Sequence, residues 1–342
     1  MMYPDLAPID WTHLPGGDAD ATSAISARDR KLALAAELTQ SILPLADRLD
    51  ARGATYESSV AVLQDEPLAA RWYLDLAGLT GKTVARLKAR YRTAGLRLSP
   101  ETIAVNRQRG KEVDVAALAV FSTWINETLL ELYPAEARSP QLALTTVLAI
   151  SGARIDGAVR NMTGDDAVLI LKSLLVGEFS SRSIHIEIPR QGDGWEPYSP
   201  AANLLKQRVI RFGGRLVCEF IPGGNRPDIR VTSDGVVILV GEVKGRSDLS
   251  NLWESWVPQI GGHLQTWAAE IPLAPRVFFG TIITNEMIEG VTPGGTRHTG
   301  LRAFARSGIL NAAYNLTNIA EGEPASVASF SNLVNQLELN AT

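Results

Sequence analysis

The chain has 342 residues, with 33 Lys and Arg against 37 Asp and Glu, and 45% of its residues are hydrophobic. This apolar fraction and the small net charge of −4 exclude a disordered chain and indicate a folded core. The single cysteine, Cys218, excludes an intrachain disulfide and a cysteine-rich zinc site, and we expect it to be a small buried hydrophobe.

The sequence shows no signal for export or for membrane insertion. The first ten residues, MMYPDLAPID, are acidic and lack the basic and apolar segments of a signal peptide. The longest nearly apolar run, around Leu142–Ala153, is shorter than the roughly 20 residues that a membrane span needs. We therefore expect a cytoplasmic protein with no membrane partner.

The first part of the chain is expected to be helical, because apolar residues recur there at three- and four-residue spacing. The predicted helices are Arg28–Leu49, Leu68–Leu76, Lys82–Thr93, Val113–Leu132, Leu142–Ile150 and Asp166–Leu175. We expect residues 1–135 to form a helical N-terminal region and residues 136–342 to form a second domain.

Signals for β-strands begin near residue 180. The predicted strands are Ser183–Pro189, Arg215–Ile221, Asp228–Thr232, Val236–Lys244 and Arg276–Thr284. The predicted helices among them are Ala201–Phe212, Asn251–Glu270 and Gly300–Tyr314. A tight turn at Ser233-Asp234-Gly235 makes 229–244 a β-hairpin. The expected fold class is α/β (α+β), a mixed β-sheet flanked by helices with its core at about 199–314.

Charged residues at the end of an apolar strand are the most informative feature. Glu242 and Lys244 follow five apolar residues, and side chains two positions apart on a strand project from the same face. Asp228 begins the partner strand of the hairpin, so its carboxylate is expected to approach Glu242. Two carboxylates beside an ammonium make a hard-oxygen site suited to Mg²⁺. The alternative is a salt bridge of purely structural value at a sheet edge.

This segment resembles the PD-(D/E)XK nuclease superfamily. The residues that carry the resemblance are Pro227-Asp228, a gap of 13 residues, and then Glu242-Val243-Lys244 on an apolar strand. A second match, Pro4-Asp5 with Asp29-Arg30-Lys31, has no strand before it and is set aside. The resemblance covers about 199–284, where the predicted order of elements is similar to the αβββαβ core of that family.

The resemblance implies an activity and a role for each residue. Asp228 and Glu242 would bind Mg²⁺, and Lys244 would position the attacking water and help to deprotonate it. The metal would polarise the scissile phosphate and stabilise the leaving 3′ oxygen, which leaves 5′-phosphate and 3′-hydroxyl ends.

The sequence gives weaker signals for accessory residues of the predicted site. Many members of the family carry a further acid, and Glu219 on the preceding strand is the nearest candidate metal ligand, since 201–212 contains no acid. Gln259 and Gln265, on the helix after the Lys244 strand, are candidate accessory residues. His263 on the same helix is expected to be packed or solvated.

Nine basic residues and a single acid, Glu101, lie between Gly81 and Lys111. This segment is either a solvated helical face or a surface for a polyanion. Helices on either side of Gly78–Gly81 resemble a helix-turn-helix, whose second helix would contact phosphates. The candidate DNA contacts are Lys82, Arg86, Lys88, Arg90 and Arg92 in that helix, and Arg246, Asn251, Arg297 and His298 beside the predicted site.

Taken together, the resemblance implies a type II restriction endonuclease that hydrolyses double-stranded DNA at specific sequences. No Walker-type phosphate loop is present, which argues against a motor or ATP-driven nuclease. A homodimer matching a palindromic site is expected, with a cognate DNA methyltransferase in the same cell. Two alternatives stay open: a structure-specific repair, recombination or phage nuclease, and a DNA-binding regulator in which the acidic residues are structural.

Overall fold

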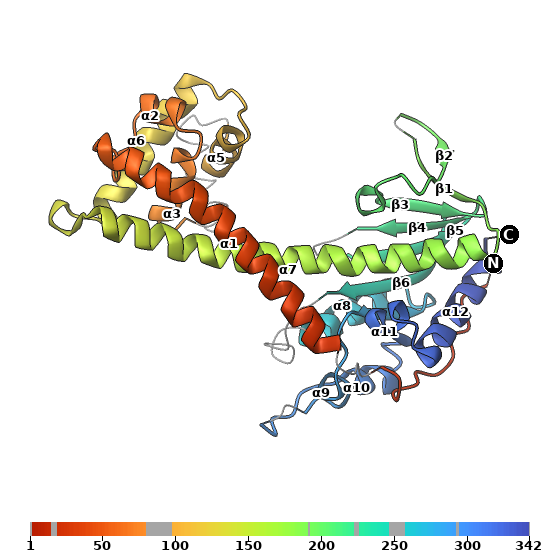
Figure 1. Cartoon of the computed structure of the whole chain (residues 1–342). Coiled ribbons are helices and arrows are strands. Elements are labelled where there is room, and N and C mark those ends of the chain that lie inside the picture. Colours follow the sequence, from red (N-terminus) through yellow and green to blue (C-terminus); the bar gives the residue numbers. More distant parts are fainter. Residues whose placement is uncertain are drawn as a thin grey trace. The chain divides into compact units, whose positions relative to one another are not determined.

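The computed structural model describes residues 2–14, 19–79, 98–190, 192–221, 226–245, 257–291 and 294–341 (Figure 1). Contacts divide the chain into two compact units. The helical unit is Asp29–Val159, and the α/β unit combines Met1–Arg28 with Arg160–Thr342. These limits differ from the boundary expected at 135/136, because residues 143 and 147 pack in the helical core and Leu14 packs in the α/β core.

The helical unit is built from helices that share one core. They are α1 (Ala19–Ala51), α2 (Val60–Asp65), α3 (Ala69–Leu76), α5 (Pro100–Gln108), α6 (Val115–Leu132), η1 (Ala135–Ala137) and α7 (Pro140–Ser181), of which α1 and α7 extend beyond the unit. Buried aromatic residues tie α3 to the preceding loop: Trp72 donates to the Thr55 carbonyl at 3.0 Å and Tyr73 to the Ala54 carbonyl at 2.7 Å. The predicted helix Lys82–Thr93 lies outside the described residues.

Two predicted helices, Leu142–Ile150 and Asp166–Leu175, are one continuous helix, α7. The prediction of a break was wrong because the intervening residues contain three glycines but no proline. Glycine in a helix costs only about 1 kcal/mol relative to alanine, whereas proline removes a hydrogen bond and clashes with the preceding turn.

Helix α6 is long and apolar enough to cross a membrane by composition alone, with a mean hydropathy of 1.3 over its 18 residues. Its residues Leu118, Phe121, Ile125 and Leu129 are buried in the core of the helical unit. One stripe of the helix, 28% of its residues, is therefore buried within the helical unit.

The α/β unit contains an eight-stranded mixed sheet, ordered β2-β1-β3-β4-β5-β6-β7-β8. Its strands are β1 (Ile186–Pro189), β2 (Trp195–Pro197), β3 (Val209–Phe212), β4 (Leu216–Phe220), β5 (Ile229–Ser233), β6 (Val236–Lys244), β7 (Arg276–Gly280) and β8 (Ala312–Asn315). Pairing is antiparallel from β2 to β6 and parallel from β6 to β8. The predicted mixed α/β class is confirmed.

The predicted hairpin is confirmed, and it joins β5 to β6. Ser233 pairs with Val236, so Asp234 and Gly235 form a two-residue loop. Both have positive φ, +49° and +81°, which is the conformation of a type I′ turn. The turn sets the register at its own end of the hairpin, and a β-bulge between Val231 and Thr232 shifts the pairing by one residue before the candidate site.

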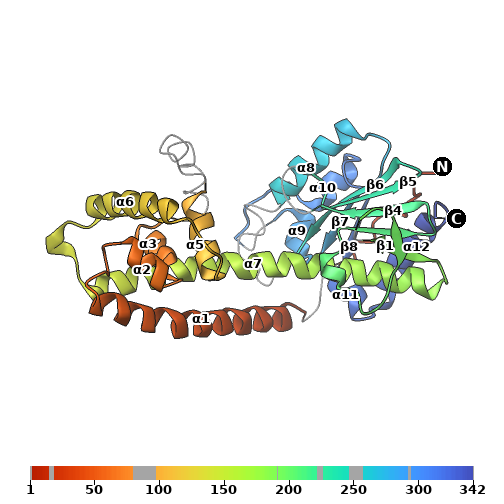
Figure 2. The same cartoon turned by 90° about the horizontal axis from the view of Figure 1, so that it is seen from above.

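Different helices cover the two faces of the sheet (Figure 2). One face packs on α7 and on α12 (Pro324–Glu338), with Cys218, Val231 and Val243 in its core. The other face packs on α8 (Val257–Glu270), on α9 (Asn285–Glu289) and on α10 (Leu301–Arg306). Its core includes Val240 and Phe278. Cys218 is fully buried, as expected, and burial raises the pKa of its thiol.

Two predicted helices of the α/β unit are wrong. In 201–212 the only helical turn is the 3₁₀ turn η2 (Leu204–Lys206), and Val209–Phe212 becomes β3 because it pairs with β4. In 300–314 the helix α10 ends at Arg306, and Ala312–Asn315 pairs with β7 as β8. In both segments, pairing with a neighbouring strand overrides the helical spacing.

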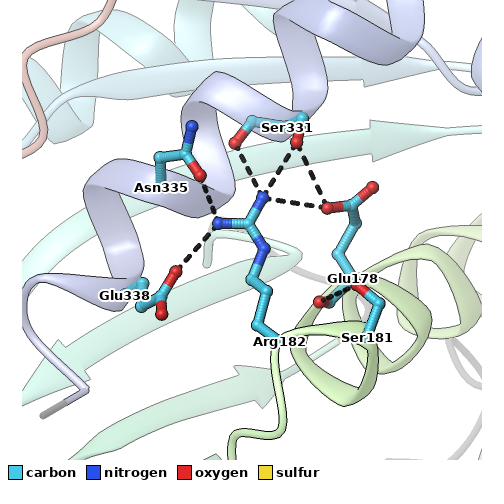
Figure 3. A network of polar contacts seen from close by, with 6 residues as sticks. All are labelled: Glu178, Ser181, Arg182, Ser331, Asn335 and Glu338. Carbon is cyan, nitrogen blue, oxygen red and sulfur yellow. Dashed lines mark hydrogen bonds and ion pairs between the residues drawn. The ribbon is translucent and has the colours of Figure 1, made fainter.

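The end of α7 is held to α12 by a network centred on Arg182 (Figure 3). Its guanidinium donates to Glu338 at 2.9 Å, to Glu178 at 3.0 Å and to the Ser331 hydroxyl at 2.8 Å, and it also bonds Asn335. The network joins the two helices that cover one face of the sheet.

Candidate active site

Strand pairing places the three charged residues of the motif together. Glu242 and Lys244 are two positions apart on β6 and therefore share a face with Val240, the face covered by α8. Asp228 immediately precedes β5, and the pairing of Ile229 with Gly241 sets it opposite Glu242. The convergence expected from the hairpin is present, while the catalytic roles of these residues remain predictions.

The side chains of the trio are in direct contact. The Lys244 ammonium bonds Glu242 Oε1, and its Nζ lies 3.6 Å from Asp228 Oδ2. Asp228 Oδ2 also accepts a hydrogen bond from the backbone N–H of Val243 at 2.9 Å. This bond fixes the Asp228 carboxylate against the strand that carries the other two residues.

A glycine allows the strands around the trio to pack closely. A Cβ at Gly241 would lie 2.8 Å from Ile229 Cγ2 and 3.1 Å from the Phe279 ring. The absence of a side chain at Gly241 therefore leaves room for the side chains of Ile229 and Phe279 on the face of the sheet opposite to that of Glu242.

Burial sets the electrostatics of the site. Glu242 is 1% exposed, whereas Asp228 and Lys244 are 12% and 21% exposed. Burial and the neighbouring Asp228 raise the pKa of Glu242, although Lys244 opposes this. Burial by itself lowers the pKa of Lys244, but Glu242 and Asp228 together raise it above its ordinary value. The site thus holds two acidic groups around one ammonium at the end of the strand.

His263 of α8 also belongs to this cluster. Its Nδ1 lies 3.2 Å from both Oε1 and Oε2 of Glu242, and its ring packs 5.8 Å from that of Trp267. The expectation that this histidine is merely packed or solvated overlooked the contact. A signal was present in the sequence, because His263 shares the helical stripe of the buried residues Ile260, Leu264 and Trp267.

The donor set of the trio suits a small hard cation. Asp228 and Glu242 offer carboxylate oxygens, which are the ligands of Mg²⁺, an ion that retains several waters. Among the residues that the structure describes, no group of three or more His, Cys, Asp or Glu forms a complete metal site. Asp228 and Glu242 are the residues that would hold a magnesium ion, and the ion remains a prediction.

Glu219, the candidate third ligand, is engaged elsewhere. It lies on β4 directly opposite Arg230 on β5, and the two side chains form an ion pair. Strand pairing puts it on the same face as the trio, one strand beyond Asp228.

Some of the other predicted site residues lie outside the described residues, and the others lie within them. Those outside the described residues are Lys82, Arg86, Lys88, Arg90, Arg92, Arg246 and Asn251. Arg297 is exposed, and His298 is half-buried with its backbone N–H bonded to the Gly290 carbonyl at 2.6 Å. Gln259 and Gln265 are exposed on α8.

No protein-family model matches this chain, and no curated protein is similar to it. The resemblance to PD-(D/E)XK nucleases therefore depends on the motif and on the geometry of these side chains.

Proposed function

We propose that this protein is a Mg²⁺-dependent nuclease of the PD-(D/E)XK type, acting on double-stranded DNA as a type II restriction endonuclease. The observation that carries the proposal is the meeting of Asp228, Glu242 and Lys244 at the end of β6. The antiparallel strands β4, β5 and β6, followed by α8 and the parallel strand β7, are also consistent with the βββαβ part of the family's αβββαβ core, whereas the helix expected before them at 201–212 is not formed.

The chain's own residues have separable roles in the proposed reaction. Asp228 and Glu242 would hold Mg²⁺, which when bound supplies Lewis-acid polarisation of the phosphate. Lys244 is positively charged between the two carboxylates, so it would orient the attacking water and stabilise negative charge on the phosphate. His263 would fix the orientation of the Glu242 carboxylate.

The specificity and the assembly follow from the family resemblance. Sequence-specific cleavage of palindromic sites would use a homodimer, with one site per subunit. A cognate DNA methyltransferase would protect the host DNA. The helical unit is large enough to contribute to recognition or dimerisation.

The test is cleavage of unmethylated phage-sized DNA by the full chain, with Mg²⁺ or with EDTA. Discrete bands are expected only with Mg²⁺. Glu242→Gln should abolish cleavage while DNA binding in a gel-shift assay persists. The matched control is Glu187→Gln, which removes a half-buried carboxylate elsewhere in the sheet, the one paired with Arg211 at 2.7 Å. This control should cut like the wild type.

Other results would redirect the proposal. A smear without discrete fragments would indicate a repair, recombination or phage nuclease with the same chemistry. DNA that is bound but not cut would favour the alternative of a DNA-binding regulator. Cleavage by Glu242→Gln at the wild-type rate would contradict the assignment of the site.

A further inference from the structure

The helical unit contains a cavity of about 270 Å³, all of whose lining residues belong to this unit. Its walls are mainly apolar and come from four helices, with Leu38, Ile42 and Leu45 on α1, Leu68 and Trp72 at α3, Val147 on α7, and the polar Gln108 on α5. An apolar cavity of about 150 Å³ is enough to admit a benzene molecule. The space here therefore suits an organic group of somewhat larger size.

A polar cluster forms one side of this cavity. Asp75 is only 1% exposed, and its Oδ2 accepts hydrogen bonds from Arg154 and, at 3.2 Å, from the Ser151 hydroxyl. Arg154 also donates to the Ser151 hydroxyl at 2.6 Å. Arg71, one turn before Asp75 on α3, places its Nε 3.3 Å from Asp75 Oδ1. Charged groups at an apolar wall are costly unless they have a function or are well paired.

The pairing within the cluster is incomplete. Among the described residues, the buried Arg154 Nε has no hydrogen-bond partner. Arg71 Nε and Asp75 Oδ1 face each other as an ion pair but do not meet the geometry of a hydrogen bond. A buried N–H group left without an acceptor costs about 1–3 kcal/mol. An acceptor supplied by a ligand would remove this cost.

The net charge of the cluster determines which charge the ligand should carry. Two guanidinium groups, Arg71 and Arg154, face one buried carboxylate, Asp75, which leaves one net positive charge. Two other acids are near: Glu37 on the cavity wall is exposed, and Glu101 lies 4.0 Å from Arg71 with its side chain 40% exposed. Both are solvated, so they neutralise the half-buried guanidinium groups of Arg71 and Arg154 only weakly.

We infer that this cavity binds a small organic monoanion, a carboxylate with an apolar body, whose charged end meets Arg71 and Arg154 while its body lies among the leucines of α1 and α3. The planar guanidinium is the side chain best matched to a carboxylate. This site is separate from the trio at Asp228, Glu242 and Lys244, and it does not depend on nuclease activity.

The test is calorimetric titration of the full chain with octanoate, together with three related probes. Octanoate is expected to bind at one site per chain. Acetate, which lacks the apolar body, 1-octanol, which lacks the charge, and octylammonium, which has the opposite charge, should each bind at least about tenfold more weakly. Absence of octanoate binding at millimolar concentration, or equal binding of octanoate and octylammonium, would overturn the inference.

Two variants locate the binding site. Arg154→Gln is expected to weaken octanoate binding about tenfold or more, since a hydrogen bond to a charged group is lost. Leu38→Trp should do the same by filling the apolar part without touching the ion pairs. The matched control is Arg52→Gln, which removes an exposed guanidinium paired with Asp65 in the same unit and should change binding by less than about twofold.

The melting temperature of each variant shows whether it is folded. If Arg154→Gln does not fold, Leu38→Trp decides the outcome. Octanoate binding that is unchanged in the folded Leu38→Trp variant would contradict the assignment of the ligand to this cavity.

Discussion

His263 Nδ1 lies 3.2 Å from each carboxylate oxygen of Glu242, so a side chain of α8 contacts the most buried acid of the sheet. An ionised Glu242 carboxylate accepts a hydrogen bond from the imidazole N–H, and this bond holds the carboxylate in one orientation. Both residues belong to elements, β6 and α8, that follow each other in the chain.

We expect His263→Ala to lower the cleavage rate by about 10- to 100-fold while DNA binding is unchanged, because partners of this kind orient metal ligands. His263→Asn, whose amide reaches the position of Nδ1, should restore much of the rate. The measurement is single-turnover cleavage as a function of Mg²⁺ concentration. Equal rates for wild type and His263→Ala would show that the contact has no part in the reaction.

Lys244→Met is expected to lower cleavage by about 10²- to 10⁴-fold, the usual contribution of a group that assists proton transfer. It should also make stability fall more steeply as the pH rises. Burial and Asp228 raise the pKa of Glu242, and Lys244 lowers it. Without Lys244, the pKa of Glu242 is therefore higher still. A carboxyl with a raised pKa in the folded state contributes stability at low pH that is lost as the pH rises through that pKa.

Urea unfolding of Lys244→Met at acidic and alkaline pH checks the second part of this expectation without any substrate. Lys206→Met, at an exposed position, is the control and should follow the wild type at every pH. A parallel pH dependence for Lys244→Met and wild type would contradict the coupling within the trio.

Arg182→Ala should lower the free energy of unfolding by about 2–4 kcal/mol, because one half-buried guanidinium bonds Glu178, Ser331 and Glu338. The control is Arg215→Ala, which breaks an exposed ion pair with Asp234 and should cost at most about 1 kcal/mol. Thermal and urea unfolding of the two variants give the comparison. Equal losses would mean that the network in Figure 3 has no more stabilising effect than a surface pair.

Asp75→Asn is expected to change how stability depends on pH. Burial raises the pKa of Asp75 from its ordinary 3.8 to about 7, although Arg71 and Ser151 lower it. The stability that the protonated carboxyl contributes is therefore present below about pH 4 and is lost as the pH rises to about 7. Asparagine does not ionise, so the variant should gain up to about 4 kcal/mol relative to wild type across that range.

Urea unfolding across this pH range measures the effect. Asp65→Asn, which changes an exposed aspartate of the same unit, is the control. The difference in free energy of unfolding between this variant and wild type should not depend on pH. A constant difference for Asp75→Asn as well would show that Asp75 is already ionised at acidic pH.

Local patterns predicted the hairpin of β5 and β6 well. The limits of β6, Val236–Lys244, agree with the prediction because an apolar run ends in charges and begins after an Asp-Gly turn. The approach of Asp228 to Glu242 also followed from the hairpin, since the residues are only 14 positions apart, although a β-bulge between Val231 and Thr232 shifts the register by one residue on the way.

Helical spacing was a poorer guide where strands pair at a distance. Val209–Phe212 and Ala312–Asn315 have apolar residues compatible with either period, and hydrogen bonds to β4 and β7 made them strands. Neither partner strand can be inferred from the segment itself.

The sequence by itself determined the mixed α/β class, the hairpin and the placing of two carboxylates and an ammonium at one strand end. These depend on neighbours in the chain, where turn geometry and side-chain alternation decide the structure. Tertiary structure alone decided that His263 reaches Glu242 and that Arg154 meets Asp75, 79 positions away. Such contacts arise when separate elements pack to bury apolar surface, and no local pattern specifies which polar groups that packing brings together.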